Sequence, residues 1–248
     1  MPTRATLLDL LVPELPGGER LDVGGLFGAG GPGGVGGALH VEIGCGSGGF
    51  LVSAAATMPE VRWLGVEWAA GYARKTAHRL ARRGLTHARV LRADAGEVLR
   101  RLGEASVACL YMYHPDPWPK KRHWKRRLVQ DRFVREVGRV LEPGALWWVQ
   151  TDHAGYYEWI LERLGPAERE GWLERHAVTE GAWQWPAAPE VTVKGRKPAE
   201  AEAGVAEVGG AGAEAILQTN FERKALAGGI QIHRAVWRRT VLKQPGEP

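Results

Sequence analysis

The stretch Leu39-His40-Val41-Glu42-Ile43-Gly44-Cys45-Gly46-Ser47-Gly48-Gly49 is the clearest indication of the fold of this 248-residue chain. Its short apolar run predicts a buried strand over 39–43, and the glycines that follow predict a tight turn into a helix over 48–57. Glycines let the backbone approach a ligand closely, and the first helical turn presents free N–H groups. The stretch therefore predicts a ligand site where a strand passes into a helix.

Outward from this stretch, short apolar runs alternate with longer amphipathic ones. They predict strands over 61–66, 90–92, 107–112 and 145–150, and helices over 71–83, 96–102 and 131–140. This alternation indicates an α/β fold, doubly wound, with a mostly parallel sheet whose ligands gather at the carboxyl ends of the strands. A helix over 216–226 and a strand over 230–237 would complete a seven-stranded, Rossmann-like sheet with an antiparallel C-terminal edge pair.

Two segments have a composition that is typical of loops. Nine of the fourteen residues over 24–37 are glycine, which predicts a flexible loop. The segment 186–215 contains no Leu, Ile, Phe, Trp or Met, which predicts a long surface insertion. We therefore expect residues 1–38 to form an N-terminal extension with a Gly-rich loop, and 39–248 to form a single domain that contains the insertion.

Charge and cysteine usage narrow the class of protein. The chain has 33 Lys and Arg against 28 Asp and Glu, but residues 71–139 alone hold 18 and 6, which indicates a polyanionic partner. Two cysteines cannot form a disulfide framework, and the eight histidines lack metal-ligand spacing. No apolar run reaches the ~18 residues that span a bilayer. We expect a cytoplasmic protein that binds neither a membrane nor a metal.

Acidic residues lie at the ends of three successive predicted strands. Glu42, beside the turn, would repel a pyrophosphate but attract a cationic methionyl group. Glu67 could accept hydrogen bonds from both ribose hydroxyls, and Asp94 one from an adenine amino group. These acids favour S-adenosylmethionine as the cofactor, although Gly44-x-Gly46-x-x-Gly49 also fits a dinucleotide. Asp94 is equally well explained as a helix N-cap.

The fourth predicted strand leads into Tyr111-Met112-Tyr113-His114-Pro115-Asp116-Pro117-Trp118-Pro119-Lys120. Alternate prolines hold this segment extended, so that Asp116 could bind the N–H edge of a base, whereas Trp118 more simply supplies packing volume. Six cations follow over 120–127, and the predicted helix 71–83 adds further positive charge. Such a run is usually a solvated surface, but its place beside the site favours contacts with phosphates.

These residues resemble the bacterial tRNA (guanine-N7-)-methyltransferases over roughly 39–239. The resemblance rests on Glu42-Ile43-Gly44-Cys45-Gly46-x-Gly48, Gly65-Val66-Glu67, the string 115–127, Thr151-Asp152 and Thr219-Asn220-Phe221-Glu222. The chain departs from the family at Ser47, Gly49, Tyr113, His114 and Trp124, where Lys, Arg, Asn, Phe and His are common. The resemblance makes 39–248 a single methyltransferase domain.

The resemblance implies an enzyme that transfers a methyl group from S-adenosylmethionine to N7 of guanine 46, in the variable loop of tRNA. It implies that the cofactor binds to Glu42, Gly44, Gly46, Gly48, Glu67, Asp94 and Asp116, with Asp116 also catalytic. It assigns substrate binding to Lys120, Arg122, His123, Lys125, Arg126, Arg127, Asp152, Thr219, Asn220, Phe221 and Glu222. Asp152 could instead cap a helix from Tyr156, and Thr219 with Glu222 could form a capping box.

Guanine N7 carries a lone pair and no proton, so we expect Asp116 to hold the base rather than to remove a proton. Three rival functions remain open: an NAD(P)-binding oxidoreductase, a nucleic-acid methyltransferase that acts on an amino group, and a noncatalytic RNA-binding module. The oligomeric state, monomer or homodimer, is not determined by the sequence.

Overall fold

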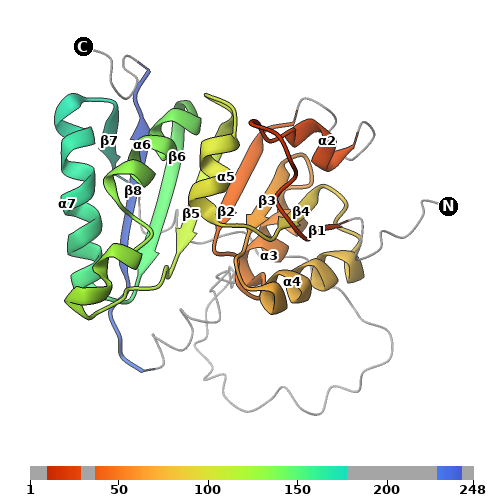
Figure 1. Ribbon diagram of the computed structural model, residues 1–248, viewed down its shortest axis with the longest axis horizontal. Helices are drawn as coiled ribbons and strands as arrows, with labels where there is room; N and C mark the ends of the chain where they lie inside the picture. The colour runs from red at the N-terminus through yellow and green to blue at the C-terminus, as the bar shows by residue number, and fades with distance from the viewer. Residues whose placement is uncertain (1–9, 29–36, 178–227, 242–248) are drawn as a thin grey trace, which may run out of the picture.

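The computed structural model describes residues 10–28, 37–177 and 228–241, and these build an eight-stranded sheet with helices on both faces (Figure 1). The strand order is β1-β4-β3-β2-β5-β6-β8-β7. The strands are β1 (Leu11–Val12), β2 (Leu39–Ile43), β3 (Arg62–Val66), β4 (Ala88–Leu91), β5 (Val107–Tyr113), β6 (Leu141–Thr151), β7 (Leu173–His176) and β8 (His233–Arg239).

Seven helical segments connect these strands in the described part of the chain. They are α2 (Val23–Phe27), α3 (Gly49–Thr57), α4 (Ala70–Arg82), α5 (Ala95–Arg101), the 3-10 helix η1 (Lys121–Arg126), α6 (Asp131–Val140) and α7 (Ala154–Glu170). Helix α7 ends at Gly171, whose φ of +78° is a left-handed conformation that glycine adopts without steric cost. None of the helices in the described ranges is long and apolar enough to cross a membrane.

The pairing of the strands confirms the predicted fold class. Strands β1 to β6 pair in parallel, whereas β8 is antiparallel to both β6 and β7. The predicted strand over 39–43 is found with the same bounds, and the other predicted strands and helices that lie in the described ranges shift by a few residues at most. The doubly wound, mostly parallel sheet therefore places the carboxyl ends of β2 to β6 along one edge.

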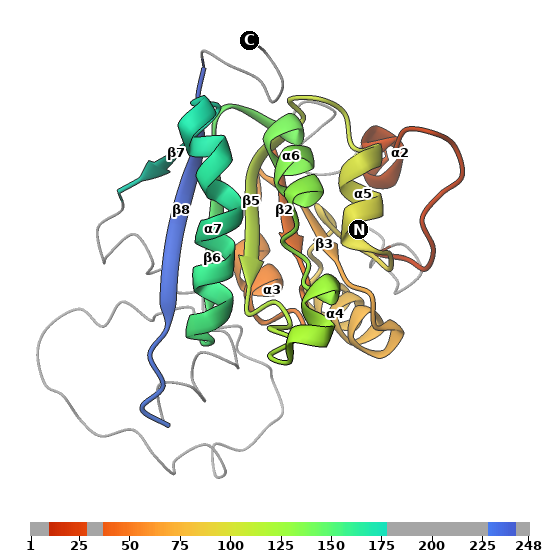
Figure 2. The ribbon, with the colours of Figure 1, turned by 60° about the vertical axis from the view of Figure 1, so that its left-hand side comes forward.

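Apolar side chains bury both faces of the sheet. One core joins α5, α6 and α7 to the sheet through residues such as Leu99, Val137 and Ile160. The other joins α3 and α4 through residues such as Leu51 and Leu80. Figure 2 shows α5, α6 and α7 in front of the sheet, while α3 and α4 lie near its lower edge.

The N-terminal segment departs from the prediction. Residues 24–27, predicted as part of a flexible loop, belong to α2, and Phe27 is buried under the guanidinium groups of Arg62 and Arg89. In addition, β1 adds an eighth strand beside β4. Residues 10–28 thus pack into the same sheet and core as the other described residues. The predicted insertion 186–215, the predicted helix 216–226 and most of the Gly-rich loop lie outside the described residues.

Candidate active site

Five acidic side chains lie at or just beyond the carboxyl ends of five neighbouring parallel strands. In the order of the sheet, from β4 to β3, β2, β5 and β6, they are Asp94, Glu67, Glu42, Asp116 and Asp152. Because the carboxyl ends of parallel strands meet at one edge, the fold gathers residues that are far apart in the sequence. The structure therefore brings the predicted cofactor acids and the predicted catalytic acid to the same side of the molecule.

Glu67 stabilises the glycine turn through two hydrogen bonds. Its Oε2 accepts a hydrogen bond from the backbone N–H of Gly46 at 2.8 Å, and its Oε1 accepts one from Ala69 at 2.8 Å. The backbone N–H groups of Gly44 and Cys45 also donate to the carbonyl of Val66. Each carboxylate oxygen keeps a second lone pair, so Glu67 can shape the turn and still accept from a ligand hydroxyl.

Helix α4 also stabilises this turn through two side-chain hydrogen bonds. The hydroxyl of Thr76 donates to the carbonyl of Gly46 at 2.8 Å, and Arg79 donates to the carbonyl of Ser47 at 2.6 Å. A Cβ atom on Gly48 would lie 2.4 Å from Cγ2 of Thr76, and the φ of Gly48 is +73°. Both the close approach and the left-handed backbone therefore require glycine at this position.

Glu42 is a buried acid with an unsatisfied oxygen. Only 3% of the residue is exposed, and its Oε2 has no hydrogen-bond partner among the described residues. Burial raises the pKa of Glu42 to about 8; the N–H of Leu51 acts against this rise, and the nearby carboxylate of Glu67 adds to it. A buried acceptor without a partner is costly unless a ligand supplies one, so the site suits a cationic group.

Asp94 is the N-cap of α5, as one of its two predicted roles requires, whereas its role in cofactor binding stays a prediction. Its Oδ1 caps α5 by accepting from the backbone N–H of Glu97 at 2.9 Å. It also lines a cavity of about 310 Å³, whose wall consists of Pro13, Glu14, Leu15, Trp68, Arg92, Ala93, Asp94 and Glu97. Trp68 is 73% exposed there. Sequence reasoning missed the contribution of 13–15, because nothing in the sequence indicates that the N-terminal segment returns to the end of β4.

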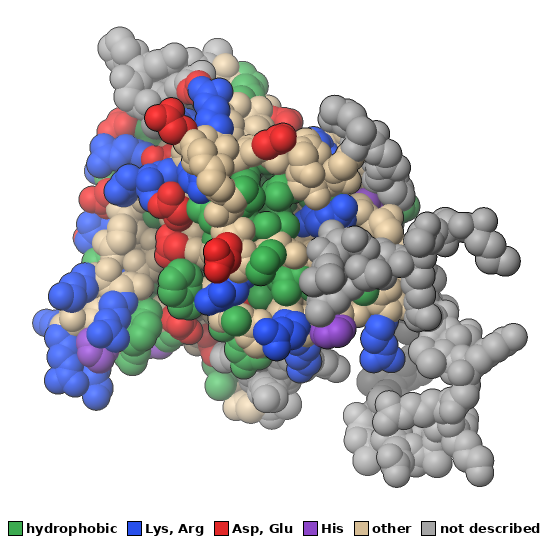
Figure 3. Space-filling view, turned by 45° about the vertical axis from the view of Figure 1, so that its right-hand side comes forward, with side chains coloured by type: hydrophobic (Ala, Val, Ile, Leu, Met, Phe, Trp, Pro, Cys, Tyr) green, Lys and Arg blue, Asp and Glu red, His purple; other side chains and the backbone are tan. Residues whose placement is uncertain are grey.

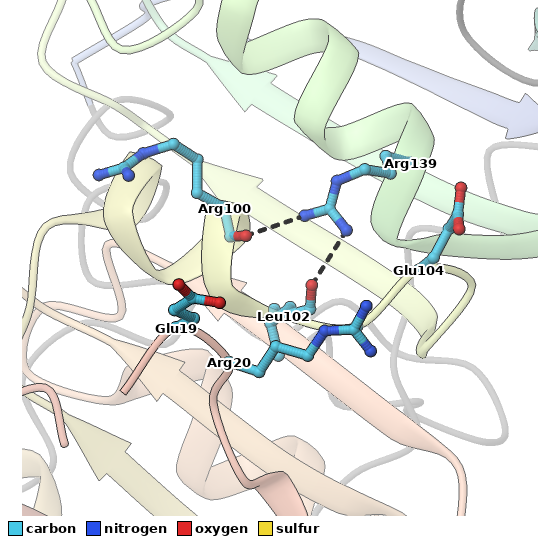
Figure 4. Close-up of a pocket in the computed structure, with 7 residues that line it drawn as sticks. Glu19, Arg20, Arg100, Leu102, Glu104 and Arg139 are labelled. Carbon is cyan, nitrogen blue, oxygen red and sulfur yellow. Dashed lines mark hydrogen bonds between the residues drawn. The ribbon is translucent and has the colours of Figure 1, made fainter. Parts of the chain in front are cut away.

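A second cavity, of about 350 Å³, lies at the opposite end of the sheet (Figure 4). Its wall includes the last turns of α5 and α6, which precede the amino ends of β5 and β6. Arg139, at its centre, donates to the carbonyls of Leu99, Arg100 and Leu102 and so joins the two helices. None of the predicted site residues that lie in the described ranges lines this cavity.

The segment between β5 and η1 has no regular secondary structure and leaves Asp116 exposed. Two residues near it, His114 and Trp118, have positive φ values of +50° and +42°. Such values are uncommon for residues other than glycine and persist only where the surroundings enforce them. The bend on either side of Asp116 is therefore built into the fold.

Arg127 corrects one prediction. The family resemblance implies that it binds the RNA substrate, but it is 4% exposed and its guanidinium group lies about 5 Å from the ring centroids of Trp124, Tyr156 and Trp159. Its Nε donates to the carbonyl of Pro117 at 2.8 Å. Arg127 therefore supports the Asp116 segment from beneath and does not face the solvent.

The other cations of the string do face the solvent. Those with exposed side chains are Lys120, Lys121, Arg122, Lys125 and Arg126. Trp118 contacts two members of the string: Arg126 lies 5.0 Å from the centroid of its ring, and the ring of His123 lies edge-on to it at 5.7 Å. The 3-10 helix thus presents its positive charge next to the Asp116 segment.

Asp152 is not the cap of α7. That position belongs to His153, whose Nδ1 accepts from the backbone N–H of Tyr156 at 3.1 Å, so the capping alternative for Asp152 is wrong. Asp152 instead lies near His114, whose ring also contacts Gln150. Residues Thr219, Asn220, Phe221 and Glu222 lie outside the described residues.

Comparison with known proteins places this chain in a family. Residues 37–187 match a family described as "Putative methyltransferase". A tRNA (guanine-N(7)-)-methyltransferase of Cutibacterium acnes is 33% identical over 231 residues, which cover 90% of this chain and 68% of that protein. One of Nitrobacter hamburgensis is 38% identical over 60% of this chain and 58% of its own length. An S-adenosylmethionine-dependent O-methyltransferase from Thermotoga maritima is 15% identical, with a TM-score of 0.46, over 84% of this chain and 61% of that one.

The fold and the match over most of the described residues define a methyltransferase. More particularly, the chain belongs to the tRNA (guanine-N7-)-methyltransferase family. It spans between about half and two thirds of the length of most of the curated relatives that it matches.

Proposed function

We propose that this protein transfers a methyl group from S-adenosylmethionine to N7 of guanine in tRNA, at position 46 of the variable loop. The buried and unpartnered oxygen of Glu42 supports the proposal most strongly, because it lies beside the glycine turn and suits a cation rather than a phosphate. The names of the relatives agree with this activity.

The residues around the turn fit the proposed cofactor. S-adenosylmethionine supplies a methyl group on a cationic sulfonium centre. Glu42 binds the positively charged amino-acid end, while Glu67 uses its remaining lone pairs for the ribose hydroxyls. The cavity beside Asp94 accommodates the adenine, with Trp68 as an aromatic wall. The glycines at 44, 46 and 48 allow the backbone to approach the ligand closely.

Asp116 acts on the base without serving as a strong general base. Guanine N7 attacks through its own lone pair, so the protein must mainly align the base with the methyl group. The Asp116 carboxylate accepts hydrogen bonds from the N1–H and amino group of guanine and stabilises the positive charge that develops on the purine. The packed Arg127 and the bent backbone at His114 and Trp118 hold that carboxylate in place.

The RNA lies against η1 in this proposal. Lys120, Arg122, His123, Lys125 and Arg126 contact its phosphates, and Asp152 contacts the substrate together with residues 219–222. Arg127 is left out of this set because it is buried.

The test combines labelled S-adenosylmethionine with unmodified tRNA and maps the product by N7-specific chain cleavage. We expect label at a single guanine in the variable loop. Asp116→Asn should lower kcat/KM by ~100-fold, the usual effect of removing one such interaction. Asp131→Asn, at an exposed acid outside the site, is the matched control. Full turnover by Asp116→Asn, or label on an amino group, would refute the proposal.

A further inference from the structure

Helix α4 presents a continuous row of positive charge to the solvent. The exposed residues are Arg74, Lys75, His78, Arg82 and the C-cap Arg83, and we call them the basic α4 surface. The opposite side of the helix is buried against the sheet through Ala73, Thr76, Ala77 and Leu80. At 3.6 residues per turn these two sets occupy separate sides of the helix, so the positive charge is concentrated on one side.

Among the described residues, no carboxylate pairs with the cations of this surface. Residues 68–93 contain seven Arg and Lys and no Asp or Glu. In the described part of the chain, none of the α4 cations has an acidic partner within ion-pair distance, whereas Arg100 and Arg238 elsewhere pair with Glu97 and Glu174. An unbalanced row of this kind produces a local positive potential that attracts polyanions.

The basic α4 surface is fixed relative to the site. Thr76 and Arg79 of the same helix bind the carbonyls of the glycine turn at Gly46 and Ser47. In Figures 1 and 2, α4 lies at the same lower end of the molecule as the yellow-green 3-10 helix that follows β5. Figure 1 shows them on either side of the strand ends, and Figure 3 shows Lys and Arg side chains along that lower edge.

We propose that the basic α4 surface binds the phosphate backbone of the RNA substrate, so that the RNA is held on both sides of the site, by η1 and by α4. This inference rests on the proposed function. Phosphodiester RNA fits better than an anionic membrane, because the apolar side of α4 is already buried against the sheet. The guanidinium groups of the arginines and the ammonium group of the lysine can bind phosphate oxygens at successive nucleotides along an RNA strand.

The experiment compares tRNA binding by wild type with that of Arg74→Gln/Lys75→Gln/Arg82→Gln over a range of salt concentrations. Arg79 and Arg83 are left intact because they contribute to the turn and to the helix end. The expected Kd for tRNA rises ~10- to 100-fold at physiological salt, and the slope of log K against log salt falls by about 2, as for two or three lost phosphate contacts. The Kd for S-adenosylmethionine should stay within twofold.

Two further variants make the result interpretable. Arg74→Lys/Lys75→Arg/Arg82→Lys keeps the charge and should bind tRNA as wild type does. Arg20→Gln/Arg100→Gln/Arg169→Gln removes as many exposed charges at the opposite end of the sheet and should leave the salt slope unchanged. A separate measurement compares the binding of phosphatidylserine vesicles by wild type and by Arg74→Gln/Lys75→Gln/Arg82→Gln.

Several outcomes would overturn the inference. One is an unchanged salt slope of tRNA binding in Arg74→Gln/Lys75→Gln/Arg82→Gln, the α4 neutral variant. Another is an equal loss of tRNA affinity in Arg20→Gln/Arg100→Gln/Arg169→Gln. The third is a loss of vesicle binding by the α4 neutral variant while its tRNA binding is intact. The proposed function fails separately: if wild type transfers no methyl group to guanine N7 while the α4 neutral variant still loses tRNA affinity, the RNA surface stands and the enzymatic assignment does not.

Discussion

Nδ1 of His114 lies 3.5 Å from Oδ1 of Asp152 and so links the segment after β5 to the end of β6. Arg234 donates to Oε1 of Gln150 at 3.1 Å, which fixes the orientation of that amide. The Nε2 of Gln150 therefore donates to Nε2 of His114 at 2.9 Å, and the proton of the histidine ring sits on Nδ1, facing the Asp152 carboxylate. His114, at a position where the family commonly has phenylalanine, thus orients Asp152, which is predicted to bind the substrate.

Replacing this histidine should separate its contact from its backbone role. His114→Asn keeps a residue that tolerates a φ of +50° but cannot reach Asp152 in the same way. We expect the KM for tRNA to rise ~10-fold, the cost of about one charge-assisted hydrogen bond, with kcat within twofold. His114→Val should also lose stability, since β-branched residues are strained there. Steady-state kinetics with an unchanged KM for His114→Asn would contradict the role.

Binding of S-adenosylmethionine should release a proton from Glu42. Its pKa of about 8 means that the carboxyl is mostly neutral at pH 7, whereas a cationic ligand pairs with the carboxylate. Affinity is expected to rise by up to ~10-fold per pH unit from pH 6 to 7.5. Calorimetry in buffers of different ionisation enthalpy should count about one proton released at pH 7. A Glu42→Gln variant that kept the same pH dependence would exclude this carboxyl as the source.

The same carboxyl links stability to pH with a defined sign. Because its pKa is raised above the ordinary value of 4.5, its contribution to stability is complete below about pH 4.5 and is lost as the pH rises through about 8. Without ligand, Glu42→Gln should therefore gain stability relative to wild type between pH 6 and 9. Urea unfolding at each pH measures this difference, and a difference that stays constant over the range would refute the raised pKa.

Gly48→Ala should abolish the geometry of the glycine turn. The new methyl group would meet the Thr76 side chain, and the φ of +73° adds backbone strain of about 1 kcal/mol. We expect a loss of S-adenosylmethionine affinity of at least ~10-fold, from the displacement of the turn. Thr76→Ala in the same chain should restore part of it, because it removes Cγ2 and Oγ1 and leaves only Cβ, at 3.0 Å, against the new methyl group. Equal affinities for the single and double variants would show that the contact is unimportant.

Replacing Arg127 should affect the stability of the protein, whereas replacing its neighbour Arg126 should affect tRNA binding. Arg127→Ala removes a buried group that contacts three rings and a carbonyl, and should cost about 2–4 kcal/mol in unfolding free energy. Arg126→Gln, at an exposed side chain, should leave unfolding unchanged and reduce the salt slope of tRNA binding by about 1. Denaturant titrations and binding isotherms measure the two effects. An Arg127→Ala protein as stable as wild type would restore that residue to the RNA-contacting set.

The strand-end acids could be predicted because parallel strands share one carboxyl edge, so a coarse reading of strands and helices was enough to bring Glu42, Glu67 and Asp116 together. The burial of Arg127 could not be predicted from the sequence. Within the basic string Arg127 resembles its neighbours, and its burial depends on Tyr156 and Trp159, which lie 29 and 32 residues further along the chain.

The N-terminal elements were missed for a different reason. A strand of two residues and a five-residue helix that contains two glycines have no hydrophobic period to detect. They form because tertiary contacts favour them: Phe27 is buried, and Arg89 donates to the carbonyl of Leu26 at 2.8 Å.

Strands β1 and β7 end the sheet in the described part of the chain, and both are short. A two-residue strand offers another chain few unpaired N–H and C=O groups, and the four-residue strand at the other end carries Glu174 and Arg175 at exposed positions. Neither end therefore provides a long, flat template for strand addition. The brief strand of the N-terminal segment thus protects the sheet against edge-to-edge aggregation.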